Sequence, residues 1–555
     1  MNILYKRFGK FLNKNSSFVF LSIFALISFY IRVAYITANP IGLDEPFSIF
    51  HAQMSISEII ENLKGGNNPP LYEIMLHYWI SIFGISPISV RFPSLIFSVV
   101  NVVFVFLILR KFLDIKVAII ATTLITFSSF HIYFSHEARV YSLFALLTTI
   151  SFYLLFQILS NKKSLYIFGS LLICYLILGF SHYFGAFVIL LQLVIMLFYG
   201  YMTKETLKKY LYLLSCFILF YSIYIPEFVS RFLDSSINGT WLKPVENLGN
   251  LHDILFLFSN ESKFIYLLFI SVLWAALWKY IYKSIIYKYL KGMLLVVIVP
   301  LFFLTSYSIF FKIPFIWKLT SIQAYTWFFV ISTLSFLIYY LIRDTKAALY
   351  PKIVLIWFVA SLFVFFGVSF YIPIFLSRYL IFIAPAFYML ISISLSYLFK
   401  TKFYYLVVSI IIVAMILDVD CKNIENLGTD ITIEHVKELK TNENKLIICP
   451  YQFQLSFLYY YNKDYFIDYN SIKTNMNKEN IFVISNLSEL KSVVNTYDSS
   501  LIYLDVHSSF IYPHNGILDS LKTNFNIENR FEYRDSVVIY YLKRKEPLKS
   551  GSILE

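Results

Sequence analysis

Apolar runs of about 20 residues recur along the first 420 positions, and short segments rich in lysine and arginine separate them. A helix of that length crosses the hydrocarbon core of a bilayer. The pattern therefore predicts a polytopic α-helical membrane protein with about 13 transmembrane helices. The predicted spans are 17–38, 88–109, 117–134, 141–160, 164–180, 183–201, 209–227, 262–280, 291–311, 321–342, 353–371, 378–399 and 402–419.

The pattern changes after residue 420, where asparagine, lysine and acidic residues surround short apolar runs. Three of these runs predict buried strands, and two stretches between polar turns predict helices. Strands that alternate with helices are typical of a small α/β domain. We therefore expect a transmembrane domain over 1–420 and a soluble α/β domain over 421–555. The predicted strands are KLIICPY, NIFVISN and SLIYLDVH, the helices IEHVKELKT and LSELKSVVNTY, and the last segment, RFEYRDSVVIYYLKRK, a hairpin.

Composition supports this division. Of the 555 residues 59% are hydrophobic and only 14% are charged, which excludes a soluble core for the first 420 residues. The formal net charge of +13 could suggest a nucleic-acid partner. Most lysines and arginines of the transmembrane region, however, lie in alternate short loops, so the charge is explained by topology. The C-terminal region contains no glycine-rich nucleotide-binding motif.

Basic loops predict the orientation in the membrane. Cytoplasmic loops carry an excess of lysine and arginine, and here the basic loops are 110–116, 162–163, 204–209, 279–291, 343–352 and 400–402. The basic N-terminus is then a cytoplasmic, retained anchor, because no convincing cleavage site follows the first apolar run. The other loops and the C-terminal domain are expected outside the cytoplasm. The abundance of lysine, asparagine, isoleucine and tyrosine favours a bacterial source, and hence the cytoplasmic (inner) membrane.

The first outer loop, 39–87, contains an acidic pair, Asp44 and Glu45, directly after the first span. Residues that anchor a helix at the interface are usually basic or aromatic, so two carboxylates there indicate a reaction site. A cap on the helix that begins near Pro46, or a solvated pair, is the structural alternative. Apolar spacing predicts an amphipathic helix from Phe47 to Leu63 and another over 71–84.

Further ionisable residues lie at the ends of other spans on the same predicted face: Arg91, Glu137, Arg139, His182 and Arg378. Residues that share one face can converge on one cavity. Structural roles are the alternative, since Arg378 could snorkel to the interface and Glu137 could pair with Arg139. No ligand spacing demands a metal, although acids and histidines on this face leave a divalent metal as an option, and no other cofactor is expected.

Nucleotide sugars are normally absent outside the cytoplasm, so an activated sugar must arrive through the membrane. A polyprenyl-phosphate-linked sugar meets this requirement. Its phosphate would be bound by Arg378, Arg139 or Arg91, because the donors of a guanidinium form a fixed fork that suits phosphate. Glu137 and His182 would be further substrate contacts. A carboxylate would remove the proton of an acceptor hydroxyl as that hydroxyl attacks the anomeric carbon.

Six segments in order resemble a known family. They are the first-loop DE pair, NNPPLYEIMLHYW, RFPSLIFSVV, SHEARVYSLFALLT, SHYFGAF and SRYLIFIAP. Together they resemble glycosyltransferase family 39 of the GT-C membrane glycosyltransferases, akin to protein O-mannosyltransferases and the lipid A aminoarabinose transferase. The resemblance covers about residues 15–420. It implies a GT-C fold and an inverting hexosyl- or pentosyltransferase with a polyprenyl-phosphate donor and a lipid, glycan or protein acceptor.

The resemblance also implies residue roles. Asp44 matches the catalytic carboxylate of the family's first loop and would be the general base, and Glu45 completes the acidic pair of the protein mannosyltransferases. Arg378 matches an arginine expected to face the lipid phosphate. One departure concerns Asn68, which precedes two prolines where aminoarabinose transferases carry lysine. The departure argues against transfer of aminoarabinose to lipid A. No sugar-binding repeat domain supports a protein acceptor.

Two other classes remain open. A flippase or transporter for lipid-linked glycans also needs many spans and ionisable residues in a cavity. Transporters tend to show internal repeats and helices broken near the membrane midplane, whereas this chain shows no repeat between its halves and gathers its charges at one face. A glycan polymerase would share the lipid phosphate chemistry and transfer an oligosaccharide.

Overall fold

The computed structural model describes residues 2–545 apart from 43, 161–163, 200–203, 240–241, 243–244, 246–248, 283–348, 399–401, 421–427, 468, 496–497, 512–515 and 534–536. The chain divides into two compact units. The helical unit consists of Met1–Ile36, Leu63–Tyr72 and Arg91–Cys421. The sheet unit consists of Thr37–Asn62, Glu73–Val90 and Lys422–Glu555, so most of the first outer loop folds with the C-terminal residues.

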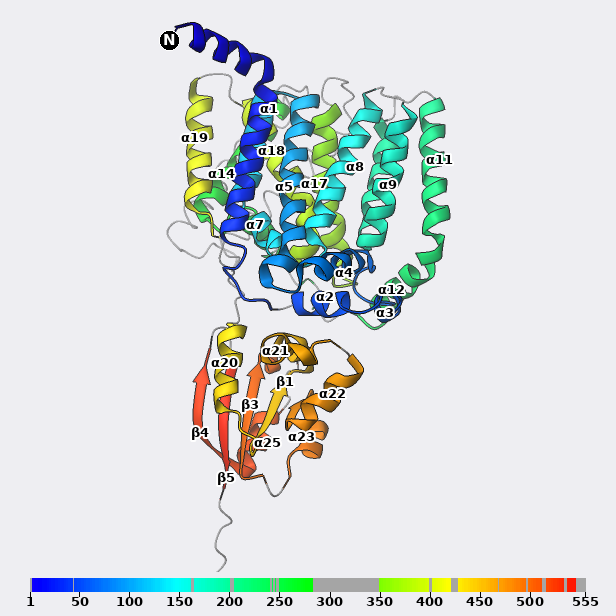
Figure 1. Cartoon of the computed structure of the whole chain (residues 1–555). Coiled ribbons are helices and arrows are strands. Elements are labelled where there is room, and N and C mark those ends of the chain that lie inside the picture. The colour runs from blue at the N-terminus through cyan, green and yellow to red at the C-terminus, as the bar shows by residue number, and fades with distance from the viewer. Residues whose placement is uncertain are drawn as a thin grey trace, which may run out of the picture. The chain divides into compact units, whose positions relative to one another are not determined.

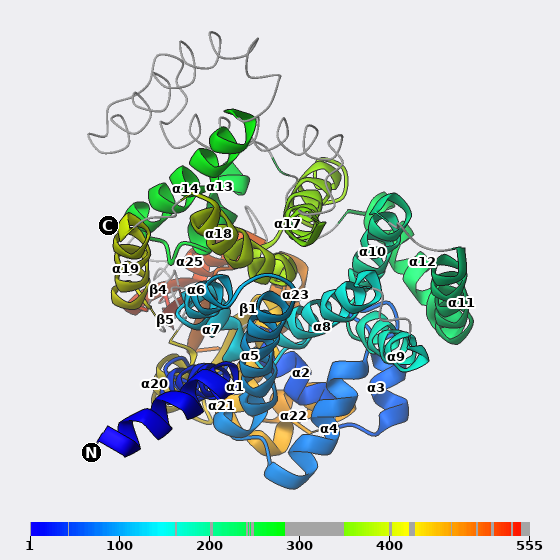
Figure 2. The same cartoon turned by 90° about the horizontal axis from the view of Figure 1, so that it is seen from above.

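Most of the long helices of the helical unit run alongside one another in Figure 1, and several of them are seen nearly end-on in Figure 2. The helices of this unit are α1 (Asn2–Ala34), α5 (Pro87–Phe112, whose first turn belongs to the sheet unit), α6 (Ile115–Thr126), α7 (Ser129–Ser135), α8 (Tyr141–Leu159), α9 (Leu165–Ser181), α10 (Gly185–Tyr199), α11 (Lys204–Tyr221), α12 (Ile225–Ile237), α13 (Gly249–Leu257), α14 (Lys263–Tyr282), α17 (Leu349–Val368), α18 (Ala384–Leu398) and α19 (Lys402–Leu417). A short 3-10 helix, η3 (Ser377–Ile383), leads into α18.

Six helices in the described part of the chain are long and apolar enough to cross a membrane, or seven if the bent pair α6 and α7 forms one span. Four shorter helices, of 10–17 residues, are also apolar. The expectation of several apolar helices long enough to cross a membrane is confirmed, but the predicted number of about 13 spans is not. Two of the predicted spans, 291–311 and 321–342, lie outside the described residues.

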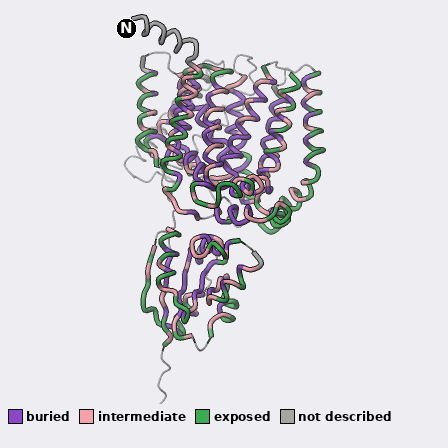
Figure 3. The backbone as a smooth tube through the Cα atoms, in the orientation of Figure 1, coloured by how far each residue is buried: buried purple, intermediate pink, exposed green. Residues whose placement is uncertain are grey.

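Burial differs across the helical unit, as the purple interior of Figure 3 shows. Nearly every side chain of α8 and most of α18 are buried, so these helices form its centre. Helix α11, in contrast, exposes Leu219 (68%) and Phe220 (56%). Large apolar side chains that remain exposed on a helix of this composition are typical of a surface that faces lipid.

The bent pair α6 and α7 meets at an angle of 60°, and polar side chains from α18 and from the turn between α13 and α14 contact the break. The Asn260 amide oxygen accepts from the Ser129 N–H at 2.8 Å, and its amide nitrogen donates to the Phe127 carbonyl at 3.0 Å. The Tyr388 hydroxyl donates to Ser128 at 2.6 Å. Backbone groups freed within a bilayer need such partners. The break sets the direction of α7, and α7 leads into the His136–Arg139 turn.

The sheet unit is built on a five-stranded sheet of order β2-β1-β3-β5-β4 (Figure 1). Strands β1 (Lys445–Cys449), β2 (Ile481–Val483) and β3 (Ser500–Val506) are parallel, and β4 (Phe525–Glu532) and β5 (Val537–Arg544) form the antiparallel side. The helices of this part are α20 (Thr429–Leu439), α21 (Gln454–Tyr461), α22 (Tyr469–Lys478), α23 (Leu487–Val493), α24 (Ser508–Ile511) and α25 (Ile517–Asn524). The parallel strands with helices between them confirm the predicted α/β pattern, and the antiparallel pair β4 and β5 confirms the terminal hairpin. Most residues of β1 and β3 are buried.

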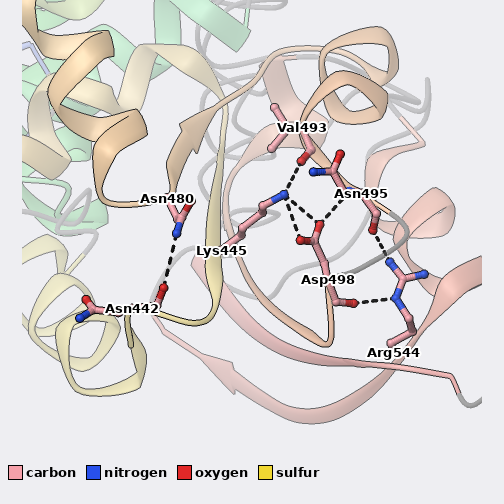
Figure 4. Close-up of polar contacts among 7 residues, drawn as sticks. All are labelled: Asn442, Lys445, Asn480, Val493, Asn495, Asp498 and Arg544. Carbon is pink, nitrogen blue, oxygen red and sulfur yellow. Dashed lines mark hydrogen bonds and ion pairs between the residues drawn. The ribbon is translucent and has the colours of Figure 1, made fainter.

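A polar cluster closes the end of the sheet where β1 and β3 begin (Figure 4). The Lys445 ammonium lies 3.0 Å from the Asp498 carboxylate and donates to the Val493 carbonyl at 2.9 Å. Arg544 donates to the Asp498 carbonyl at 2.6 Å and to the Asn495 carbonyl. These contacts hold the turn between α23 and β3 against the last strand.

The first outer loop forms α2 (Glu45–Ala52), α3 (Ile56–Asn62) and α4 (Leu71–Phe83). The prediction of a helix over 71–84 is confirmed. The single helix expected from Phe47 to Leu63 is observed as two, because Ser55 begins a new helix. The Glu58 carboxylate accepts from the Ser55 N–H at 2.9 Å and from its hydroxyl at 2.7 Å, which is a capping-box arrangement.

Candidate functional site

The acidic pair stands at the start of α2. Asp44 occupies the N-cap position, but its side chain makes no capping hydrogen bond, so the capping alternative is not realised. Glu45 is 4% exposed, and its backbone N–H donates to the Gly42 carbonyl at 3.1 Å. Asp44 is partly exposed.

Helix α4 holds α2 in place. The Ser48 hydroxyl, one turn after the acidic pair, donates to the Glu73 carboxylate at 2.7 Å. The His77 ring nitrogen Nδ1 lies 2.9 Å from the Ala52 carbonyl at the other end of α2. The middle and the C-terminal end of this short helix are therefore tied to α4, and Glu73, which is 5% exposed, has a structural role.

Two predicted arginines of the helical unit are almost completely buried: Arg91 is 2% exposed and Arg139 is 6% exposed. The Arg91 guanidinium donates to the Ile36 carbonyl at 2.8 Å, which ties the start of α5 to the end of α1. The Arg139 guanidinium lies 5.9 Å from the centre of the Tyr141 ring, and its backbone carbonyl accepts from Ser94 at 3.2 Å. Buried charges next to helix ends are costly and are typical of sites for charged ligands.

A third buried arginine, Arg32 in α1, was missed by the sequence analysis. It is 0% exposed and donates to the Ser98 hydroxyl at 2.7 Å, to the Ser28 hydroxyl at 2.7 Å and to the His131 ring at 3.0 Å. Asn101 completes the group, 2.9 Å from the other nitrogen of His131. The sequence feature that could have identified Arg32 is an arginine inside an apolar span, because an ionisable residue there suggests a functional site.

His136 links this group to the turn that carries Glu137 and Arg139. Its Nε2 atom donates to the Arg32 carbonyl at 2.8 Å, whereas its Nδ1 atom is buried and has no hydrogen-bond partner in the described part of the chain. Burial, with the charges of Arg32 and Arg91 and against the opposing effect of the hydrogen bond to the Arg32 carbonyl, lowers the pKa of His136 to about 3. The ring is therefore neutral and presents one unused acceptor.

His182 lies in the turn between α9 and α10 and presents a hydrogen-bond donor, whereas His136 presents an acceptor. Its ring stacks on Phe144 with centres 4.4 Å apart, and Nδ1 accepts from the Phe184 N–H at 3.2 Å. Burial, followed by the charge of Arg139, lowers the pKa of His182 to about 3. A neutral ring that accepts at Nδ1 carries its proton on Nε2. That N–H is buried and has no hydrogen-bond partner among the described residues.

The remaining predicted residues have different surroundings. The Glu137 carboxylate accepts from the Tyr133 hydroxyl, one helical turn earlier in the chain. The Arg378 guanidinium lies 5.8 Å from the centre of the adjacent Tyr379 ring, and that ring lies 5.8 Å from His182. The helical unit thus brings Arg139, His182 and the Arg378 segment together. Asp44 and Glu45 belong to the sheet unit.

Among the described residues, no group of three or more histidine, cysteine or acidic side chains is arranged to hold a metal ion. The cluster in the helical unit contains instead guanidinium groups and the Nε2–H donor of the neutral His182 ring, which suit an anionic ligand.

Residues 67–226 match the sequence model of the dolichyl-phosphate-mannose-protein mannosyltransferase family. Four of the six recognised segments lie inside this stretch, including those with Arg91, Arg139 and His182. The predicted resemblance to protein mannosyltransferases is therefore confirmed over these residues. The acidic pair and Arg378 lie outside the matched stretch. The roles of all the predicted site residues, inside and outside that stretch, stay predictions. No curated protein gives a significant match to the sequence.

Several solved structures of membrane glycosyltransferases are similar to this chain. The Archaeoglobus fulgidus oligosaccharyltransferase in complex with zinc and sulfate has a TM-score of 0.45 and 14% identity, with 87% of this chain and 68% of that chain covered. The same organism's AglB with an inhibitory peptide and a dolichol-phosphate has a TM-score of 0.48 and 13% identity, covering 97% and 75%. ArnT from Cupriavidus metallidurans bound to undecaprenyl phosphate has a TM-score of 0.43 and 10% identity, covering 95% and 98%. At these values the similarity carries no inference about substrate or residue roles.

Proposed function

We propose that this protein is a membrane glycosyltransferase that moves a sugar from a polyprenyl-phosphate donor to an acceptor hydroxyl on the extracytoplasmic face of the cytoplasmic membrane. The observation that carries the proposal is the cluster of Arg139 with the unused N–H of His182 inside the stretch that matches the mannosyltransferase family. A buried guanidinium beside a buried, unsatisfied donor favours an anionic oxygen as the ligand.

In this proposal Arg139 and His182 bind the donor phosphate, and Arg378 and Arg91 add positive charge around it. Charge builds up on the phosphate oxygen as the bond to the sugar breaks. Donors that are already oriented stabilise that charge without further rearrangement, and the chemistry depends on this electrostatic help. Glu137, held by Tyr133, would contact the sugar or the acceptor.

Asp44 acts as the general base. The acceptor oxygen forms a bond to the anomeric carbon as the bond from that carbon to the phosphate oxygen breaks, and the acceptor proton passes to the Asp44 carboxylate. Attack from the side opposite the phosphate inverts the anomeric configuration. Glu45 lies next to Asp44 in the chain and completes the acidic pair. General-base catalysis of this kind contributes about a hundred- to ten-thousandfold in rate.

The test measures transfer of radiolabelled sugar from polyprenyl-phosphate donors to lipid, glycan and protein fractions by the purified protein. Asp44→Asn should lower turnover about a hundred- to ten-thousandfold. Glu61→Gln, which removes an acid from the same loop outside the proposed site, should retain wild-type turnover. The labelled fraction identifies the acceptor class, and a parallel reaction with a chelator tests the option of a divalent metal.

Two results would overturn the proposal. Transfer that survives Asp44→Asn would place the base elsewhere, and the absence of transfer with every donor would favour the flippase alternative. The anomeric configuration of the product, determined by NMR, tests inversion separately.

A further inference from the structure

The C-terminal part of the chain contacts the acidic loop through α21 and the turn after it. The hydroxyl of Tyr460 accepts from the Ile41 N–H at 2.5 Å, three residues before Asp44. The neighbouring Tyr459 hydroxyl donates to the Ile85 carbonyl at 2.8 Å, just after α4. Two consecutive tyrosines of one helix thus hold the loop near both of its ends.

A third contact holds the end of α2. The Gln53 side-chain amide donates to the Phe466 carbonyl at 2.9 Å, and the Phe466 ring packs against the Phe50 ring of α2 with centres 5.3 Å apart. Phe50 and Phe466 are both 0% exposed. The Phe466 ring also packs against Tyr459 at 5.6 Å, so the aromatic contact and the tyrosine hydrogen bond belong to one cluster.

These contacts differ from ordinary surface contacts because they are at least partly buried. Ile41 is 0% exposed and Tyr459 is 1% exposed, so removal of the Tyr460 hydroxyl would take the partner from a backbone N–H of a buried residue. Nothing in the sequence of α2 alone positions it: it has only 8 residues and no side-chain cap. Its position depends on packing against α4 and α21.

We infer that Tyr460, with Tyr459 and Phe466, is a positioning element that holds the loop bearing Asp44 in its reactive geometry. We call these three residues and their contacts with Ile41, Gln53, Phe50 and Ile85 the loop latch. The C-terminal domain then takes part in the reaction, as a support for the base. That the loop latch supports catalysis rests on the proposed function of Asp44. That it holds the loop in place does not depend on that function.

The first experiment compares Tyr460→Phe with Tyr461→Phe in the full-length protein. Each change removes one hydroxyl from the same helix, but the Tyr461 hydroxyl donates to Glu479 at 3.0 Å and not to the loop. Hydrogen exchange of the segment 41–53 should become about tenfold faster in Tyr460→Phe and stay unchanged in Tyr461→Phe. Unchanged exchange in both variants would overturn the latch, whatever the enzymatic activity.

Kinetics then test the positioning role. Tyr460→Phe should lower turnover about ten- to a hundredfold with the KM for the lipid donor changed less than about twofold, because misplacing a catalytic group affects the chemical step. Tyr461→Phe should match wild type in both constants. Wild-type turnover in Tyr460→Phe would overturn the inference. Faster exchange at 41–53 in a protein without any transferase activity would support the latch and refute only the proposed function.

A cross-link between the loop and α20 distinguishes a positioning role of Tyr460 from a general loss of stability, because only a positioning defect should be repaired by fixing the loop in place. A Cβ atom built on Gly42 would lie 3.4 Å from the Thr429 hydroxyl of α20, so Gly42→Cys and Thr429→Cys can form a disulfide. In a background with Cys216→Ser and Cys421→Ser, oxidation should restore turnover to Tyr460→Phe, and reduction should remove it again. Failure of the formed disulfide to restore turnover would count against a positioning role.

Discussion

In the helical unit the buried arginines are held by side chains and carbonyls of neighbouring helices, whereas in the sheet unit the acidic pair stands on a short helix held by α4 and the tyrosines of α21. Arg32 alone bonds two serines and a histidine from three helices. Asp44 has no capping hydrogen bond. The comparison suggests that the proposed binding residues are set by a rigid bundle, and the proposed base by a loop that needs external support.

The largest effect on stability is expected at Arg32. Arg32→Ala removes the buried guanidinium that donates to Ser98, Ser28 and His131, so we expect a loss of about 3 kcal/mol or more. Arg110→Ala is the matched control, because Arg110 also donates to a serine, Ser17 at 2.7 Å, but on the surface. Its loss should be below about 0.5 kcal/mol. Heat unfolding in detergent measures both, and equal midpoints would contradict the view of a rigid bundle.

A smaller and more specific effect is expected at His182. His182→Phe keeps an aromatic ring against Phe144 but removes the unused Nε2 donor. The KM for the lipid donor should rise about ten- to a hundredfold, since hydrogen bonds to charged groups contribute about 1.5–3 kcal/mol. The unfolding temperature should change little, because that donor has no partner to lose within the described residues.

The control is His252→Phe, in which a stacked histidine that already pairs with Asp253 at 3.0 Å is replaced. It should leave the donor KM unchanged. A lower unfolding temperature in His182→Phe with an unchanged donor KM would show that His182 is structural.

The smallest effect is expected in the C-terminal sheet, far along the chain from the acidic loop. Lys445→Met removes the cation of the half-buried pair with Asp498 and should destabilise the sheet by about 1.5 kcal/mol. Exchange of β1 and β3 amides should accelerate about tenfold, with transfer activity retained. Lys543→Met, which breaks an exposed pair with Glu528, should change exchange by less than about threefold. Loss of transfer in Lys445→Met would mean that support of the loop extends beyond the latch.

Local patterns were sufficient for most secondary structure and for much of the candidate site. Apolar runs located the long helices, and alternation of short strands with helices predicted the C-terminal sheet. The break between α2 and α3 was also a local feature, since the Ser55–Glu58 capping box is readable in the sequence. It was missed because apolar spacing continues across the break.

The sequence by itself determined an apolar multi-helix region, a separate α/β domain, and arginine, histidine and acidic residues at the ends of spans, because these depend on neighbours within a few residues. Only the tertiary structure decided that Arg32 joins His131, 99 positions away, and that Tyr460 holds Ile41, 419 positions away. Such contacts satisfy buried polar groups, and which distant residue supplies the partner is set by how helices and strands pack and not by any local pattern.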